Sequence, residues 1–364
     1  MANVLFLSYG DSHYDGRMRE LIKIAQGLGT VYSVTRNKDE KTERDYVLKS
    51  KSVFSYVEFI FASLKMARKI SQVDIIFIDN RLGCMPGILL KKIHKKAYFI
   101  QDVRELYIIE EQTTVRAKAG CLIEQIMIKQ ADAIVCANRY RANIMMENFD
   151  LCTTPLVYEN LRKLTYKSEL LKEECEIKYR VLRELDKKIV ISTSGWRIDR
   201  TNDVLLDAVA NKEDLFLLLV GTGPDKDRKI IEQKILDQAI KNVMIIDTVT
   251  EGELKYLLSI STIGVVNYGD YDTNNRYCAS GKIYEFLFEE IPVVTTENLP
   301  LKELCNQYKI GRADNHYIDA INEIIENYEE YISNIKIFLE QNDVMNNNEH
   351  LIQELKKMMI KEET

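Results

Sequence analysis

The sequence predicts two doubly wound α/β domains followed by a helical tail. Short apolar runs alternate with segments of helical spacing from the first residues onward, which is typical of parallel sheets with crossover helices. The alternation stops over residues 161–187, which are charged and helical without a strand, and it restarts at residue 188. The length of 364 residues agrees with two domains of roughly 150 residues each. We therefore expect an N-terminal domain over 1–160, a connector over 161–187 and a C-terminal domain over 188–345.

The N-terminal domain begins with NVLFLS (3–8), an apolar run that indicates a buried strand. Residues 15–29 have the spacing of an amphipathic helix that ends in Gly, and 53–70 form a longer predicted helix. Further strands are predicted at 30–35, 74–79, 97–102, 133–138 and 155–160.

The C-terminal domain restarts the same alternation. Its strands are predicted at 188–195, 214–223, 242–248, 262–269 and 291–297. From about Tyr317 onward the spacing is purely helical, which predicts the tail.

Composition disfavours several classes of protein. The net charge of −6, from 50 basic and 56 acidic residues, argues against a general nucleic-acid binder. The seven cysteines form no C-x-x-C pair and the four histidines are far apart, so we expect reduced thiols in a cytoplasmic protein and no zinc site. The sequence contains no run of ~18 apolar residues, so no membrane span is predicted.

Charge is distributed unevenly along the chain. Residues 1–160 carry an excess of about four basic groups, and the remainder carries an excess of about ten acidic groups. Two explanations of this uneven charge are equally good: chance variation, and an N-terminal domain that faces an anionic phospholipid surface. Two groups of residues bear on such a surface: Lys91, Lys92, Lys95 and Lys96, and Phe54, Tyr56, Phe59 and Phe61. We interpret the lysines as complementing a helix dipole and the aromatics as packing, with membrane contact as the alternative.

The glycine-rich loops do not match the common nucleotide-binding fingerprints. G-x-G-x-x-G is missing after the first strand, and the second strand ends in Arg36 and Asn37 instead of an acidic residue. A later loop has Gly221 and Gly223, but Lys226 stands where a third glycine belongs. Neither a P-loop nor a G-x-S-x-G elbow is present, so nicotinamide enzymes, P-loop NTPases and α/β-hydrolases are disfavoured.

The strongest local feature is ASGKIYEFLFEEIPVVTT (279–296). Ser280 and Gly281 stand where a helix is predicted to begin, and Lys282 adds a positive charge that suits phosphate. Glu285 lies one turn later, where its carboxylate is able to accept hydrogen bonds from ribose hydroxyls. The alternative is a capped helix with a Lys–Glu pair on its surface.

This segment resembles the sugar-nucleotide motif of the retaining GT-B glycosyltransferases of family four, roughly (S/P)-x-K-x-x-E-(Y/F)-(L/M)-x-x-G-x-P-V-V. Other segments resemble the same family in order over about 310 residues. They include DGRMRELIKIAQGLG, QDVRELYIIE, VYEN, SGWRIDRTNDVLLDAV and LLLVGTGPD. The resemblance implies two Rossmann-like domains that face a cleft, with the nucleotide-sugar on the C-terminal domain and the acceptor on the N-terminal one. It also implies a last helix, 346–362, that crosses back to the N-terminal domain, and a reaction without metal or cofactor.

The resemblance implies a set of donor-binding residues: Gly10, Arg197, Arg200, Gly221, Gly223, Ser280, Gly281, Lys282 and Glu285. Glu285 matches the ribose-binding carboxylate, and Lys282 matches the cation at the phosphate-binding helix start. The second cation on the diphosphate is Arg197 or Arg200, because the family pattern is degraded there. Gly10 matches a flexible loop before the first helix, with a simple turn as the alternative.

Two departures from the family affect the chemistry. Tyr277 stands where many members have a second Glu, so either Asp270 or Asp272 takes over the role of that Glu or the donor is held differently. The family's D-x-H-E segment reads Asp102-Val103-Arg104-Glu105, and these three charged residues are the candidate catalytic groups. Arg104 replaces a histidine, so it offers electrostatics and hydrogen bonds without proton transfer. A structural ion pair of Arg104 with Asp102 or Glu105 is the alternative.

The resemblance predicts a cytoplasmic, metal-independent hexosyltransferase that acts with retention. Its donor is expected to be a nucleotide-sugar, most simply a UDP-sugar, and its acceptor a hydroxyl of a glycan or lipid-linked glycan at the inner face of the membrane. Two alternatives stay open: a non-hydrolysing sugar-nucleotide 2-epimerase, and a GT-B-like partner subunit without catalysis.

Overall fold

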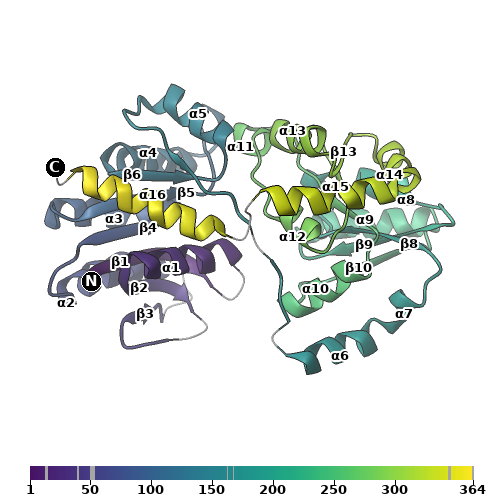
Figure 1. Cartoon of the computed structure of the whole chain (residues 1–364), viewed down its shortest axis with the longest axis horizontal. Coiled ribbons are helices and arrows are strands. Elements are labelled where there is room, and N and C mark those ends of the chain that lie inside the picture. Colours follow the sequence, from purple (N-terminus) through teal and green to yellow (C-terminus); the bar gives the residue numbers. More distant parts are fainter. Residues whose placement is uncertain are drawn as a thin grey trace. The chain divides into compact units, whose positions relative to one another are not determined.

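The computed structural model describes residues 1–12, 15–38, 41–49, 54–161, 163–166, 168–342 and 346–362. Two compact units divide the chain between them (Figure 1). Unit 1 comprises Met1–Asn160 and Met345–Thr364, and unit 2 comprises Leu161–Val344. Each unit contains one parallel sheet, so the predicted pair of doubly wound α/β folds is confirmed.

Unit 1 has a seven-stranded sheet in the order β3-β2-β1-β4-β5-β6-β7. Its strands are β1 (Ala2–Asp11), β2 (Gly29–Asn37), β3 (Asp45–Val47), β4 (Ile75–Asp79), β5 (Tyr98–Val103), β6 (Ala133–Cys136) and β7 (Leu156–Val157). Every strand expected from the sequence is present, and β3 is an addition. The order of the strands reverses between β1 and β4, and such a switch point is where ligands bind in this kind of fold.

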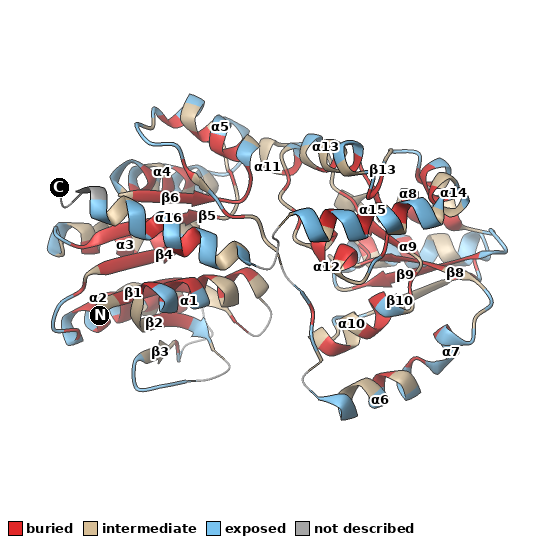
Figure 2. Cartoon of the chain, viewed as in Figure 1, coloured by how far each residue is buried: buried red, intermediate tan, exposed pale blue. Residues whose placement is uncertain are grey.

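Helices cover both faces of this sheet. They are α1 (Gly16–Leu28), α2 (Ser55–Lys69), α3 (Cys84–Ile93), α4 (Val115–Gln130), α5 (Arg139–Phe149) and α16 (Asn347–Glu362), with short turns η1 (Arg81–Gly83) and η2 (Ile109–Glu111). Side chains alternate along β1, so Val4 and Phe6 pack against α1 and α16, whereas Leu5 and Leu7 pack against α2, α3 and α4. Figure 2 shows the central strands β4, β5 and β6 as buried, and every residue of these three strands is buried.

The last helix, α16, lies beside α1 on unit 1 (Figure 1). Leu351, Ile352 and Leu355 are buried in the same core cluster as α1. Gly27 of α1 permits this close approach, since a Cβ atom there would lie 2.4 Å from Ile352 Cδ1. The Asn347 side chain also donates to the Glu159 carbonyl at 2.9 Å. Apolar packing and hydrogen bonds therefore both hold the C-terminal helix on the N-terminal unit.

Unit 2 has a six-stranded sheet in the order β10-β9-β8-β11-β12-β13. Its strands are β8 (Lys188–Ser192), β9 (Leu215–Val220), β10 (Val243–Ile246), β11 (Ile263–Val266), β12 (Val293–Thr295) and β13 (Gly311–Ala313). Its helices are α6 (Glu169–Lys178), α7 (Arg180–Arg183), α8 (Asn202–Val209), α9 (Asp225–Asp237), α10 (Glu251–Ser259), α11 (Thr273–Arg276), α12 (Lys282–Phe288), α13 (Leu299–Tyr308), α14 (Tyr317–Glu326) and α15 (Tyr328–Gln341), with the turn η3 (Ile198–Arg200). The switch point of this sheet lies between β8 and β11.

The segment 161–187, predicted as a connector, belongs to unit 2. Cys175 on α6, Tyr179 between α6 and α7, and Leu182 on α7 are buried in the core of that unit. These helices therefore pack on unit 2 through a narrow apolar side. The sequence prediction missed this side because most of the segment is charged.

Candidate functional site

A cavity of about 350 Å³ opens at the carboxyl edge of the unit 2 sheet. It is lined by residues that follow four neighbouring strands and by three cations: Thr193, Ser194, Arg197, Arg200, Gly221, Thr222, Thr248, Tyr268 and Lys282. Four of these were predicted as donor-binding, namely Arg197, Arg200, Gly221 and Lys282. The described residues that line the cavity include no carboxylate. The cavity therefore has the electrostatics of an anion site at the switch point of the sheet.

Lys282, the first residue of α12, is held by the loop after β8. Its Nζ donates to the Thr193 carbonyl at 2.7 Å and to Ser194 Oγ at 3.2 Å. Burial lowers the pKa of Lys282 to about 8; nearby Glu285 opposes this shift, and Arg200 and Arg197 add to it. An incoming anion would favour the charged form of this lysine, because it replaces the solvation lost on burial.

The two arginines of the cavity differ in how their charge is compensated. Arg197 donates to Asp199 from Nε at 2.9 Å and from Nη2 at 2.5 Å, and this pair is more than a third exposed. Arg200 lies over the ring of Tyr268, with 3.8 Å between Cζ and the ring centroid. No ion pair of Arg200 is found among the residues that the structure describes. Arg200 is thus the arginine whose charge is better placed to meet an anion.

Two glycines let the loops after β8 and β9 meet at the cavity. Gly195 has φ +66°, and a Cβ atom there would lie 2.4 Å from the Thr222 carbonyl oxygen. Gly221 has φ +120°, a conformation that L side chains rarely adopt. Buried Asn202 fixes the arrangement by donating to the Gly195 carbonyl at 2.8 Å and accepting from Ser192 Oγ at 3.0 Å. Sequence reasoning identified Gly221 and missed Gly195.

The other predicted donor-binding residues of unit 2 are not among the residues that line the cavity. Ser280 is buried, and its hydroxyl has no hydrogen-bond partner in the described structure. Gly281 precedes α12, and Glu285 is partly buried in the first turn of that helix. Gly223 packs against Trp196, whose Cδ1 would lie 2.8 Å from a Cβ atom at this position. Thr193, Ser194, Thr222, Thr248 and Tyr268 were missed by sequence reasoning, although each lies near the end of a predicted strand.

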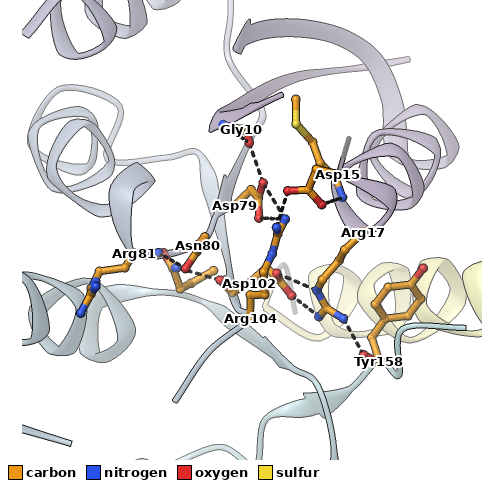
Figure 3. A network of polar contacts seen from close by, with 12 residues as sticks. Gly10, Asp15, Arg17, Asp79, Asn80, Arg81, Asp102, Arg104 and Tyr158 are labelled. Carbon is orange, nitrogen blue, oxygen red and sulfur yellow. Dashed lines mark hydrogen bonds and ion pairs between the residues drawn. The ribbon is translucent and has the colours of Figure 1, made fainter. Parts of the chain in front are cut away.

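At the carboxyl edge of the unit 1 sheet, arginines and carboxylates pair with one another (Figure 3). Arg17 donates from Nη2 and Nε to the two Asp102 oxygens at 2.5 and 3.1 Å, and from Nη1 to the Tyr158 carbonyl at 3.0 Å. Arg17 is 4% exposed and Asp102 is fully buried. Burial lowers the pKa of Arg17, but the charge of Asp102 outweighs it, so the pKa is raised overall. Asp102, a predicted catalytic group, is therefore committed to Arg17.

Arg104 lies between two carboxylates that sequence reasoning did not connect with it. It donates to Asp15, and its Nη2 donates to Asp79 Oδ1 at 2.9 Å (Figure 3). Burial opposes the charge of Arg104, whereas Asp79 and Asp15 raise its pKa. The alternative of an ion pair with Asp102 or Glu105 was thus right in kind and wrong in partner. Glu105 instead lies 3.6 Å from Arg141 Nη2 and is 38% exposed.

Gly10 lies inside β1, because that strand extends to Asp11, so the predicted flexible loop does not begin there. A Cβ atom at Gly10 would lie 2.9 Å from both Met18 Sδ and Ser8 Oγ. The Gly10 amide donates to Ser8 Oγ, which in turn donates to Asp79 Oδ2 at 2.6 Å. Ser8, Arg17 and Asp79 belong to this network and were missed, since their partners are distant in the sequence.

Among the residues that the structure describes, no group of three or more His, Cys, Asp or Glu side chains is placed to hold a metal ion. Whether the reaction requires a metal therefore stays a prediction.

Comparisons with known proteins identify the fold. No protein-family model and no curated protein matches the sequence. Among solved structures, sucrose-phosphate synthase from Thermosynechococcus elongatus is 16% identical, with 99% of this chain and 97% of that chain covered and a TM-score of 0.70. Anabaena HepE, solved with UDP and glucose, is 13% identical over 98% of this chain and 100% of that chain, with a TM-score of 0.74.

A second kind of protein shares the architecture. A Listeria monocytogenes protein assigned as a UDP-N-acetylglucosamine 2-epimerase is 10% identical over 92% of this chain and 90% of that chain, with a TM-score of 0.57. Identities this low establish the fold alone. The chain thus has the GT-B fold of two Rossmann-like domains, as the sequence resemblance predicted.

Proposed function

We propose that this protein is a glycosyltransferase that binds a nucleoside-diphosphate sugar in the unit 2 cavity and transfers the sugar to an acceptor hydroxyl with retention. The observation that carries the proposal is the cavity itself. Three cations and several hydroxyl and backbone groups converge at the switch point of a Rossmann-like sheet, with no lining carboxylate among the described residues. A diphosphate dianion satisfies this set of groups better than a neutral ligand does.

Each group has a role in holding the donor. Lys282 and Arg200 bind the diphosphate, and the unpartnered Ser280 hydroxyl supplies a further hydrogen bond. Glu285 accepts hydrogen bonds from the ribose hydroxyls. A UDP-sugar is the simplest donor, and the neighbour HepE is described in complexes with UDP and with UDP-glucose.

Bond breaking places negative charge on the leaving diphosphate. Fixed cations stabilise that charge in the transition state without the reorganisation that water would need. Because the cations are protein groups, we expect the reaction to proceed without a metal or cofactor. The leaving phosphate is then the group that accepts the proton of the acceptor hydroxyl, in a front-face displacement.

The charged groups of unit 1 play a supporting part in this proposal. Asp102 accepts two hydrogen bonds from Arg17, and Arg104 is held by Asp15 and Asp79, so neither is placed to exchange a proton with substrate. We assign both as positioning residues that keep the carboxyl edge of unit 1 rigid. Glu105, which is partly exposed, is the predicted catalytic residue that is able to contact an acceptor. That acceptor is expected to be a glycan or a lipid-linked glycan at the cytoplasmic face of the membrane.

Calorimetry with UDP, GDP and ADP in the presence of a chelator tests the donor site. We expect one nucleotide to bind, and Lys282→Met to weaken its binding by roughly ten- to one-hundredfold, because a charge-assisted bond to phosphate contributes about 1.5–3 kcal/mol. The matched control is Lys229→Met, on an exposed position of α9. Binding of no nucleoside diphosphate, or equal affinity of the Lys282→Met variant, would refute the proposal.

Epimerisation of the sugar nucleotide is the second candidate, because an assigned 2-epimerase shares the fold. Incubation with the bound UDP-sugar alone separates the two. A glycosyltransferase leaves the donor unchanged or slowly hydrolysed, whereas an epimerase converts it to a second sugar nucleotide that chromatography resolves. A protein that binds the nucleotide and does neither, even with glycan acceptors, would fit the partner-subunit alternative.

A further inference from the structure

Both arginines of the unit 2 cavity lie at one short turn, η3. Arg197 directly precedes the turn and Arg200 ends it, so the conformation of the turn decides where both guanidinium groups point. Thr201 closes the turn: its amide donates to the Ile198 carbonyl at 2.8 Å, and α8 begins at the following residue. The backbone of Thr201 is therefore coupled directly to Arg200, the cation whose charge is better placed to meet an anion.

Thr201 has a backbone conformation that is unusual for its residue type. Its φ is +55° and its ψ is +26°, in the left-handed region. Among the non-glycine residues that the structure describes with a positive φ, Thr201 is the only β-branched one. A branched Cβ atom is sterically disfavoured in this region, and such outliers cluster at functional sites, where surrounding contacts hold them. The turn thus keeps a strained threonine at a position that glycine would occupy without strain.

The side chain of Thr201 is not used to cap the helix that follows it. A threonine at the start of a helix commonly accepts a hydrogen bond from an amide of the first turn, but the Thr201 side chain makes no such bond with α8. Its Oγ1 instead donates to the Arg200 carbonyl at 2.8 Å. Because a hydroxyl has one proton, the contact of 2.5 Å between Oγ1 and the Tyr317 hydroxyl is a hydrogen bond that the tyrosine donates. A chain of hydrogen bonds therefore runs from this phenol to the backbone of Arg200.

Tyr317 is firmly held at the other end of this chain. It is the first residue of α14 and is 2% exposed. The helix α14 lies beside α8 (Figure 1), and Ile321 of α14 is buried with Leu205 of α8 in one core cluster. Burial raises the pKa of Tyr317, so its hydroxyl keeps the proton that it donates. The phenol is thus a fixed anchor for the turn that carries the arginines.

From this arrangement we propose that Tyr317 and Thr201 are positioning residues that orient Arg200 toward the diphosphate of the donor. The Tyr317 hydroxyl holds Thr201 in its left-handed conformation, and this conformation sets the direction of Arg200 over the ring of Tyr268. Neither Tyr317 nor Thr201 is among the residues that line the cavity, so both act through the backbone of the turn. Loss of either hydroxyl leaves the charge of the cavity unchanged and alters only where that charge is held. The inference rests on the proposed function, because it takes Arg200 as a ligand of the diphosphate.

Calorimetry with inorganic pyrophosphate, and with the nucleoside diphosphate that binds the parent, tests the role of Tyr317. The Tyr317→Phe variant removes one hydroxyl and keeps the packing of the ring. We expect it to bind both ligands about threefold to tenfold more weakly than the parent, because the guanidinium group is less well oriented. The matched control is Tyr331→Phe, which removes a buried hydroxyl of α15 that donates to Glu323 at 2.9 Å and should bind as the parent does.

The Thr201→Gly variant separates a positioning role from a structural one. Glycine relieves the strain of the left-handed backbone and removes the hydroxyl. The urea midpoint of this variant should stay close to that of the parent, because relief of strain offsets the lost hydrogen bonds, while pyrophosphate affinity falls about threefold to tenfold. Thr201→Ser keeps the hydroxyl and should recover most of the lost affinity. Ala239→Gly, at an exposed left-handed residue after α9, is the control and should bind as the parent does.

A double-mutant cycle shows whether the effect passes through Arg200. Arg200→Met alone should weaken pyrophosphate binding roughly ten- to one-hundredfold, as expected for the loss of a charge-assisted bond. In the Arg200→Met background, Tyr317→Phe and Thr201→Gly should have no further effect, because the group that they orient is gone. An equal loss with and without Arg200 would overturn the inference and assign the two hydroxyls to general stability.

The two proposals fail in different ways. A parent protein that binds pyrophosphate or a nucleoside diphosphate, together with Tyr317→Phe and Thr201→Gly variants that bind as tightly, would overturn the positioning role and leave the donor site standing. A parent protein that binds neither pyrophosphate nor any nucleoside diphosphate would refute both the donor site and the positioning role.

Discussion

The two units have the same strand order around the switch point, yet their carboxyl edges differ in how charge is compensated. In unit 1, Arg17 and Arg104 are paired with Asp102, Asp79 and Asp15 at hydrogen-bond distance. In unit 2, Lys282 has hydroxyl and carbonyl partners, and Arg200 has an aromatic ring. A saturated edge, in which the arginines are paired with carboxylates, is a rigid support. An edge whose cations have no carboxylate partner is able to bind an anion. The same topology therefore serves two purposes, and the side chains at the carboxyl edge determine which one.

The largest effect is expected from breaking the saturated edge. Arg17→Met leaves the buried Asp102 carboxylate without its partner, so the free energy of unfolding should fall by about 3–5 kcal/mol in urea titrations. The control is Arg180→Met, which removes an exposed pair with Glu184 and should cost about 0.3–0.5 kcal/mol.

The affinity of the unit 2 cavity for nucleotide should be unchanged in any folded Arg17→Met protein, because the two edges lie in different units. If Arg17→Met does not fold, Arg17→Lys supplies a milder test, since it keeps the charge and loses the two-pronged geometry. A loss below about 1 kcal/mol for Arg17→Met would show that the paired edge is not a structural support.

The next effect concerns the uncompensated edge and its response to pH. Burial lowers the pKa of Lys282 to about 8 from its ordinary value of 10.5. If only the charged lysine binds diphosphate, affinity should fall as pH rises through 8, by up to about tenfold per pH unit above it. Calorimetry between pH 7 and pH 9 measures this, and Lys282→Arg should remove the dependence.

Stability should respond to the same group with the opposite sign. Between pH 8 and 10.5 the unfolded chain binds more protons at Lys282 than the folded chain does, so the contribution of this lysine to stability rises with pH. An affinity for nucleotide that is flat across pH 8 would mean that Lys282 does not meet the diphosphate.

Sequence patterns predicted the fold well, because buried parallel strands are read from continuous apolar runs. They missed β3 and β13, whose sequences DYV and GRA are too short and too polar to form such a run. They also identified two cations of the cavity, because Lys282 and Arg200 lie in segments that resemble a known family. The spacing on α2 would have separated exposed Phe61 from buried Phe59, had the helical periodicity been followed.

The network of unit 1 was beyond the reach of sequence patterns. Arg104 and Asp15 are 89 residues apart, and Arg17 and Asp102 are 85 apart. Only the order of the strands brings β1, β4 and β5 together at one edge, so the partners of Arg104 depend on topology instead of local spacing. The same reason explains why Gly195 was missed, since its need for a glycine comes from the Thr222 carbonyl on a neighbouring loop.

The smallest effect on nucleotide affinity is expected from removing a carboxylate beside the cavity of unit 2, a change that makes this edge less like that of unit 1. Asp199 is the carboxylate that compensates Arg197 beside the cavity, in a pair that is more than a third exposed. Asp199→Asn should release this arginine and raise the affinity for a nucleoside diphosphate by a few-fold, because exposed pairs contribute about 0–1 kcal/mol. Asp237→Asn, on α9, is the control for the change in net charge. An affinity that falls in Asp199→Asn would show that the carboxylate orients Arg197 for the ligand, and the edge of unit 2 would then share the pre-paired character of unit 1.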